Sequence, residues 1–227
     1  MLTQVWPTIA SSQNKWVWLG GSNVWGAKRS IVVDKGVAMT TNYPGSRSYF
    51  SMVFGQKQNL LYIFGGLGLS AFDGYLNDLW MLNFTSNEVT WLSGSRGPNT
   101  VAVHGLRGVP SASNIPAGRR GHVMVEHPTM NALLAFGGAY YGNYGYFYLN
   151  DLWMYEHSNN QWTWLSGNSS ANVPGVYGTK GIPSASNYPG SRYGHAMVVH
   201  STLSLLYVFG GYGYDSRAAS GKYWLDF

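Results

Sequence analysis

The chain has 227 residues, of which 45% are apolar, 16% aromatic and 10% charged, and its formal net charge is +5. This composition supports a folded core and differs from that of disordered chains. The absence of cysteine excludes disulfides, thiolate metal sites and cysteine nucleophiles. No apolar run reaches the ~20 residues that a membrane helix needs, so the sequence predicts no membrane span.

An apolar run that ends in two glycines occurs three times along the chain. The first glycines of the three pairs are Gly65, Gly137 and Gly210, so the repeat period is 72 and then 73 residues. An Asn-Asp-Leu-Trp motif at residues 77–80 returns in phase at residues 150–153. Self-similarity at a fixed period indicates a repeat fold.

Each repeat contains short apolar segments that predict strands, here named a, b, c and d. In the first repeat they are residues 48–54, 60–65, 78–83 and 88–92, separated by glycine-rich or polar stretches. Four such strands in succession indicate an antiparallel meander. The second repeat, residues 119–165, has the same order. The third predicts strand a at 193–199, b at 205–210 and c at 223–226. Glycine and proline interrupt every longer segment, so no helix is predicted.

These motifs together resemble the kelch repeat. The shared features are the double glycine, Asn-Asp-Leu-Trp, an aromatic on strand c (Tyr155) followed seven residues later by Trp162, and an Arg-x-Gly-His start at Arg119 and Arg192. The resemblance, which extends to the central domain of galactose oxidase, implies an all-β, kelch-type β-propeller with three four-stranded blades per chain. In this interpretation residues 1–227 form one unit. Blade 1 spans residues 47–92, blade 2 spans 119–165, and strands a to c of blade 3 lie in 192–227.

Three blades are too few to close a propeller ring. Residues 14–20 resemble the strand d sequence at 160–166, and the third repeat has strands a to c only. We therefore expect residues 14–20 to form an outer strand that closes a last blade. The favoured arrangement is a homodimer in which strand exchange between two copies gives six blades around a two-fold axis. The alternatives are pairing within one chain and a fragment of a longer propeller.

The long b–c and d–a connections are expected on one face of the disc, where binding usually resides. The d–a segments hold six basic residues and one acidic residue, Asp34, so their net charge equals the +5 of the whole chain. A basic loop face favours an anionic partner. Exposed tyrosines in the b–c loops stack on sugar rings or anchor protein partners, although aromatics also pack between blades. The candidate ligand-binding residues are Lys28, Arg29, Arg96, Arg107, Lys180, Tyr140, Tyr141, Tyr144, Tyr212 and Tyr214. Nucleic acid is not predicted, because no dense basic run is present.

Three arginines, Arg47, Arg119 and Arg192, recur at the start of strand a. We expect them mainly to bond loop carbonyls between blades, with ligand binding at the channel mouth as a second hypothesis. Asp78 and Asp151 are expected to bond backbone amides. The residues assigned structural roles are the glycine pairs Gly65, Gly66, Gly137, Gly138, Gly210 and Gly211, and the strand tryptophans Trp80, Trp91, Trp153 and Trp164.

The sequence shows no catalytic motif, no cofactor site and no converging metal ligands. It therefore predicts a non-catalytic binding module whose long-loop face binds a glycan or a protein. Two alternatives stay open: a structural subunit of a larger extracellular or particle assembly, and an enzyme with an unfamiliar site. Residues 1–12 do not form a secretory signal peptide. Resemblance to secreted microbial kelch proteins nevertheless favours an extracellular location.

Overall fold

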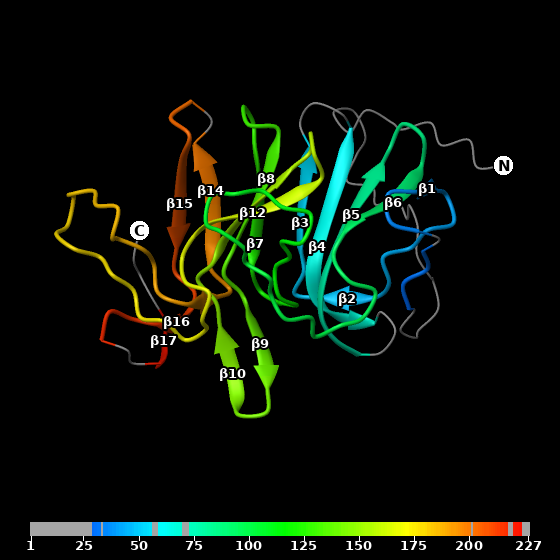
Figure 1. The fold of residues 1–227 in the computed structure, drawn as a ribbon. Coiled ribbons are helices and arrows are strands. Elements are labelled where there is room, and N and C mark those ends of the chain that lie inside the picture. Colours follow the sequence, from blue (N-terminus) through cyan, green and yellow to red (C-terminus); the bar gives the residue numbers. More distant parts are fainter. Residues whose placement is uncertain are drawn as a thin grey trace, which may run out of the picture.

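The structure, a computed structural model, describes residues 29–32, 34–55, 59–69, 73–200, 202–217 and 220–223. Within these residues every element is a strand, β1 to β17, and no helix is present. All the strand pairs are antiparallel, which confirms the predicted all-β class. The sheets lie side by side in chain order (Figure 1). The strand predicted at residues 14–20 lies outside the described residues.

The first sheet contains the predicted meander and two additional short strands. Strands a to d are β3 (Ser51–Gly55), β4 (Leu60–Leu69), β5 (Asp73–Asn83) and β6 (Glu88–Ser93). In addition, β2 (Arg47–Ser48) pairs with β4, and β1 (Ala38–Met39) pairs with β6 at the outer edge. β4 and β5 extend beyond the predicted bounds, because the double glycine shifts the register as a bulge does and does not end the strand.

The second sheet repeats this order and adds a hairpin. Its strands are β7 (Val123–His127), β8 (Ala132–Phe136), β11 (Leu152–Glu156) and β12 (Gln161–Ser166). Between β8 and β11 the chain forms a hairpin of β9 (Ala139–Gly142) and β10 (Gly145–Tyr148). The b–c connection predicted as a loop is therefore an ordered pair of strands.

The third repeat is split between two small sheets. β14 (Ala196–His200) pairs with β15 (Leu205–Phe209), and these are the predicted strands a and b. β16 (Tyr212–Tyr214) pairs with both β13 (Arg192–Tyr193) and β17 (Ser220–Tyr223). The strand c predicted at residues 223–226 lies outside the described residues except for its first position.

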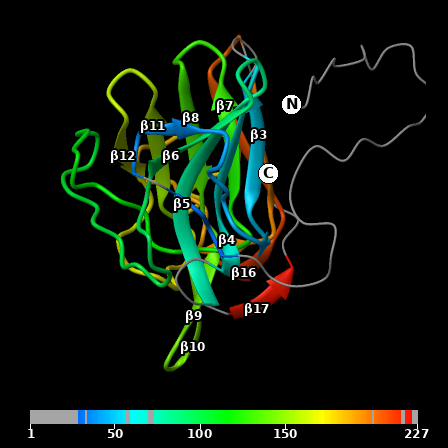
Figure 2. The ribbon, with the colours of Figure 1, turned by 90° about the vertical axis from the view of Figure 1, so that its right-hand side faces the viewer.

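The two kinds of long connection occupy different places. The β9–β10 hairpin and the β16–β17 pair lie at the same end of the molecule in both views (Figures 1 and 2). The d–a segments, in contrast, fold back along the outer strands: Gly36 N donates to Trp91 O and Gly108 N donates to Trp164 O, each at 2.8 Å. The prediction that all the long connections lie on one face is therefore wrong for the central part of these segments, because the free edge of each outer strand offers carbonyls that they bond.

The main core lies between the first and second sheets. Phe64 on β4 packs against Trp162 on β12, with 5.1 Å between ring centroids. Trp80 and Trp153 are fully buried and Trp91 is buried. Trp164 is half-buried and lies beneath the Arg107 guanidinium. Strands covered by neighbours on both faces require apolar residues on both faces, and all five residues of β8 are buried.

Each double glycine lies where the backbone of the next repeat approaches. All six glycines of the three pairs have positive φ, from 60° to 103°. Gly66 N donates to Arg119 O at 2.9 Å, and Gly138 N donates to Arg192 O at 2.8 Å. A Cβ on Gly137 would lie 2.8 Å from Arg192 O, so a side chain there would collide with the next repeat. We call this contact between a double glycine and the following arginine the repeat junction.

Candidate functional site

The buried arginine network

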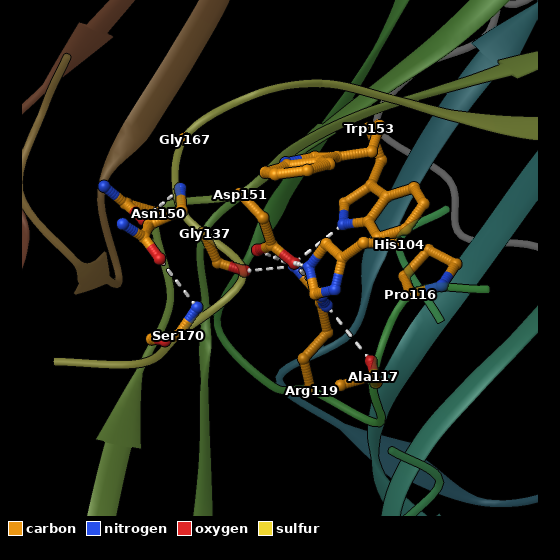
Figure 3. Close-up of polar contacts among 12 residues, drawn as sticks. His104, Pro116, Ala117, Arg119, Gly137, Asn150, Asp151, Trp153, Gly167 and Ser170 are labelled. Carbon is orange, nitrogen blue, oxygen red and sulfur yellow. Dashed lines mark hydrogen bonds and ion pairs between the residues drawn. The ribbon is translucent and has the colours of Figure 1, made fainter. Parts of the chain in front are cut away.

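Arg119 lies in the interior, where its guanidinium forms a fork-to-fork pair with Asp151 (Figure 3). Nη1 and Nη2 donate to the two carboxylate oxygens at 2.7 and 2.8 Å. The remaining N–H groups donate to Gly137 O at 3.0 Å and to Ala117 O at 3.1 Å. His104 Nε2 lies 3.5 Å from Asp151 Oδ2. Bidentate geometry, with at least one bond at each guanidinium nitrogen, makes this a strong structural contact.

The arginine–aspartate pair recurs in the first repeat, and the bond to the glycine carbonyl recurs in all three. Arg47 forms two bonds to Asp78, at 2.7 and 2.8 Å, and one to Gly65 O at 3.0 Å. Arg192 donates to Gly210 O at 3.0 Å and to Tyr177 OH at 2.8 Å. The arginines do bond carbonyls, but these carbonyls belong to the same repeat and not to a neighbouring blade as expected. Binding of a ligand by these guanidinium groups would require such buried bonds to be broken.

The aspartates do not act as the sequence suggested. Asp78 and Asp151 accept from the arginine side chains and from the indole Nε1 of Trp80 and Trp153, at 2.6 and 2.7 Å. The expectation of bonds to backbone amides is therefore wrong, because a buried guanidinium requires a carboxylate more strongly than the local amides do. Burial alone would raise the pKa of Asp151, but the Arg119 charge and the hydrogen bonds from His104, Arg119 and Trp153 hold it well below its ordinary value of 3.8.

Replacement of Asp151 by asparagine leaves the Arg119 charge buried without its counter-ion. We expect Asp151→Asn to lower the free energy of unfolding by about 3–5 kcal/mol, measured by chemical denaturation. The matched control is Asp34→Asn, which makes the same chemical change in an exposed pair, 3.3 Å from Arg96. This control should change the stability by less than about 1 kcal/mol. Equal losses in the two variants would contradict a structural role for the network.

Two buried histidines predict sensitivity to acid. Burial, together with the neighbouring arginine charge, lowers the pKa of His122 and of His195 from 6.5 to about 3. Both rings are therefore neutral in the folded protein, whereas the unfolded chain binds protons below about pH 6.5. Stability should fall from pH 6.5 towards pH 3, by about 2 kcal/mol per histidine at pH 5.

The variant His122→Phe isolates this effect, because Phe50 occupies the equivalent position in the first repeat. Denaturation at pH 7 and pH 5 should show a smaller loss in the variant than in the wild type. Asp151 does not affect the comparison, because the contribution of its carboxylate to the free energy of unfolding is lost only as the pH falls below about 3.8. If the loss of stability between pH 7 and pH 5 were the same in His122→Phe as in the wild type, this assignment would be refuted.

The aromatic cleft

A cleft of about 460 Å³ lies between the first sheet and the β9–β10 hairpin. The far ends of β4 and β5 supply one wall and the hairpin supplies the other. Its lining is polar and aromatic, and consists of Leu67, Asp73, Gly74, Tyr75, Asn99, Tyr141 and Tyr146. We call this feature the aromatic cleft.

One wall of the cleft is fixed by a reciprocal backbone clamp. Asn99 N donates to Tyr75 O at 2.7 Å, and Tyr75 N donates to Asn99 Oδ1 at 2.9 Å. Asn99 has a φ of 60°, which asparagine tolerates better than most residues. A Cβ on Gly74 would lie 2.7 Å from the Asn99 side chain, so glycine at this position makes room for the clamp.

Arg120 organises the rings beside the cleft. Its Cζ lies 5.3 Å from the Tyr49 ring centroid, 5.9 Å from that of Tyr75 and 5.1 Å from that of Tyr146. Its Nη2 also donates to Tyr146 OH at 2.8 Å. Cation–π contacts with three rings hold the two walls of the cleft together. Burial is the main cause of a raised pKa at Tyr75, so its hydroxyl keeps its proton at neutral pH.

Sequence reasoning did not single out Arg120, Tyr49, Tyr75 or Asn99. A usable signal existed for the clamp, because Tyr148 N donates to Asn172 Oδ1 in the second repeat at the equivalent positions, 73 residues later. Arg120 follows the recurrent Arg119, but the equivalent residues in the other repeats are Ser48 and Tyr193, so no recurrence marks it.

The predicted tyrosines fall into separate groups. Tyr141 is 58% exposed and lines the aromatic cleft, and Tyr144 is 95% exposed in the turn of the hairpin. Tyr140 stacks on Phe147, with ring centroids 5.2 Å apart. Tyr212 and Tyr214 pack around Tyr148, at 5.8 and 6.0 Å, in a cluster on the third repeat.

The predicted basic residues do not gather at the cleft. Arg107 lies over Trp164 at 4.5 Å and donates to Gly167 O at 2.6 Å. Arg96 lies over Trp91 at 5.5 Å. These two arginines therefore lie beside the outer strands of different sheets. Arg29 and Lys180 are exposed, and Lys28 lies outside the described residues.

The described part of the chain contains no group of three histidine, aspartate or glutamate side chains that converge on a metal position. The same described residues contain no helix with the length and apolar character that a membrane crossing requires.

Antiparallel sheets that follow one another in chain order, with recurrent double glycines, are typical of the kelch-type propeller fold. Residues 30–180, more than half of the chain, match a family profile described as the KLHDC2/KLHL20/DRC7 Kelch-repeats domain. The chain therefore belongs to the kelch-repeat family.

Among solved structures, one titled "Structure of YjhT" is similar, with 19% sequence identity and a TM-score of 0.44. The match covers 80% of this chain and 37% of that one, so the chain corresponds to little more than a third of that structure's length. No curated protein matches the chain significantly.

Proposed function

We propose that the protein is a non-catalytic binding module that holds part of a glycan in the aromatic cleft. Kelch-repeat domains are generally binding modules, and they commonly bind protein partners. The glycan is the more specific part of the proposal, and the composition of the cleft supports it.

The observation that carries the proposal is the combination of rings and hydrogen-bonding groups in one concave site. Tyr75, Tyr141 and Tyr146 offer aromatic surface, on which the apolar face of a sugar ring can stack. Asp73 and Asn99 offer a carboxylate and an amide for sugar hydroxyls. A volume of about 460 Å³ falls within the usual range of small-ligand sites.

A protein partner is the second candidate, and the hairpin turn favours it. Tyr144 is almost fully exposed, and an exposed tyrosine on an ordered hairpin is a typical anchor for a pocket on another protein. In that arrangement the contact would centre on the turn between β9 and β10 and not on the cleft.

Two tyrosines of the same hairpin distinguish the candidates. We expect binding of the purified chain to an array of neutral and acidic oligosaccharides, with affinity for the strongest binder measured by calorimetry. Tyr141→Ala should weaken that affinity about 10-fold or more, since loss of a stacking ring costs on the order of 1.4 kcal/mol. Tyr144→Ala is the matched control and should bind as the wild type does. Absence of binding to every oligosaccharide, or a loss confined to Tyr144→Ala, would contradict the glycan proposal.

A further inference from the structure

Equivalent residues form each contact between neighbouring sheets, and one face of the β14–β15 sheet, here called the third sheet, has no such contact within the described residues. Tyr62 on β4 is 3% exposed, because it stacks on His157 of the second sheet at 4.8 Å. Leu134, its equivalent on β8, is buried as well. Tyr207, the equivalent on β15, is 47% exposed, and its neighbour Leu205 is exposed too. The third sheet thus presents an apolar face of the kind that the first two sheets bury.

The first sheet exposes the complementary face. A methionine occupies the same position on each strand a, at Met52, Met124 and Met197. Met124 and Met197 face the preceding sheet and are 3% and 5% exposed, whereas Met52 is 55% exposed. Phe50 is likewise exposed, although His122 and His195 at the same position are buried. The exposed face of the third sheet and the exposed face of the first sheet therefore correspond to the two surfaces that contact each other between successive sheets inside the molecule.

We propose that a second copy of this chain covers both ends, with the third sheet of each copy packed against the first sheet of the other. The new contact would continue the established packing between sheets, with Leu205 and Tyr207 of one copy on Phe50 and Met52 of its partner. Two such contacts related by a two-fold axis close the assembly, so no apolar end remains. This inference is independent of ligand binding in the aromatic cleft.

The backbone supports the same arrangement. At the two repeat junctions inside the chain, Gly66 and Gly138 donate to the carbonyl of the following arginine. Gly211 occupies the equivalent position with a φ of 96°, and no arginine of a following repeat is present within the described residues. Arg47 is the one recurrent arginine that no described double glycine precedes. A bond from Gly211 N to Arg47 O of the second copy would complete the series.

A second and separate observation concerns the outer edge of the third sheet. We call residues 35–42, 107–114 and 180–187 the edge segments. In the first, Lys35 Nζ lies 4.8 Å from the Trp91 ring and Asn42 Nδ2 donates to Val89 O at 2.8 Å. In the second, Arg107 lies over Trp164 and Asn114 Nδ2 donates to Trp162 O at 2.9 Å. These two edge segments therefore each bind an outer strand through a cation on tryptophan and an asparagine amide.

The third edge segment has the same groups but faces no outer strand among the described residues. Lys180, Gly181 and Asn187 occupy the positions of Arg107, Gly108 and Asn114, and Lys180 is exposed. A strand of the second copy that presents a tryptophan to Lys180 would complete this edge.

Light scattering of the full chain tests this proposal. We expect a mass of twice the 25.0 kDa of one chain. Tyr207→Lys and Met52→Lys each place a charge in the proposed contact, and each should reduce the mass to that of a monomer. Because both side chains are exposed within one copy, the variants should keep the wild-type circular dichroism. Tyr144→Lys introduces the same charge in the exposed hairpin turn and should stay dimeric.

Mixing the two monomeric variants tests the pairing of unlike ends. A pair made of one Tyr207→Lys copy and one Met52→Lys copy contains one unmodified contact, so the mixture should recover dimers. A monomeric wild type, a mass well above two chains, or a Tyr207→Lys variant that stays dimeric would overturn the proposal. Failure of the mixture to recover dimers would overturn the pairing of the third sheet with the first.

Discussion

The buried pair between Arg119 and Asp151 is the interaction on which the arrangement of the second repeat depends. The guanidinium bonds the carboxylate at the start of β11 and the carbonyls of Gly137 and Ala117. It thereby joins the double glycine, the Asn-Asp-Leu-Trp motif and the end of the d–a segment. The pair is favourable only if every donor is satisfied, and this requirement fixes all three chain segments together.

The repeat junction connects this interior contact to the neighbouring sheet. The Arg119 backbone bonds Gly66 N and Leu76 O of the first repeat, so the arginine is held from both sides. Arg120 follows directly and bonds Ala139 at the base of the hairpin, through both its N and its O, at 2.9 Å. Its side chain lies among the tyrosines of the aromatic cleft, outside the interior network. The position of the cleft is therefore a consequence of the same junction that joins the sheets.

The strands, the repeat period and the family could be predicted from the sequence, because apolar alternation and recurrent glycines depend on local conformation. The positions of the d–a segments could not, since the bonds from Gly36 and Gly108 to the outer strands join residues more than 50 positions apart. The aromatic cleft was only partly predictable. Tyr141 was identified from its exposed hairpin, but Tyr75 and Asn99 become neighbours of it only when two repeats pack together.

The central claim is that the junctions between successive repeats hold the fold together. Amide hydrogen exchange at Gly66 and Gly138 tests it directly, with the partly exposed Gly97 as the internal reference. The account predicts that both junction amides exchange only through global unfolding, at rates matching the stability of the whole protein. Exchange of either amide as fast as that of Gly97 would show that the junction opens independently, and would contradict the account.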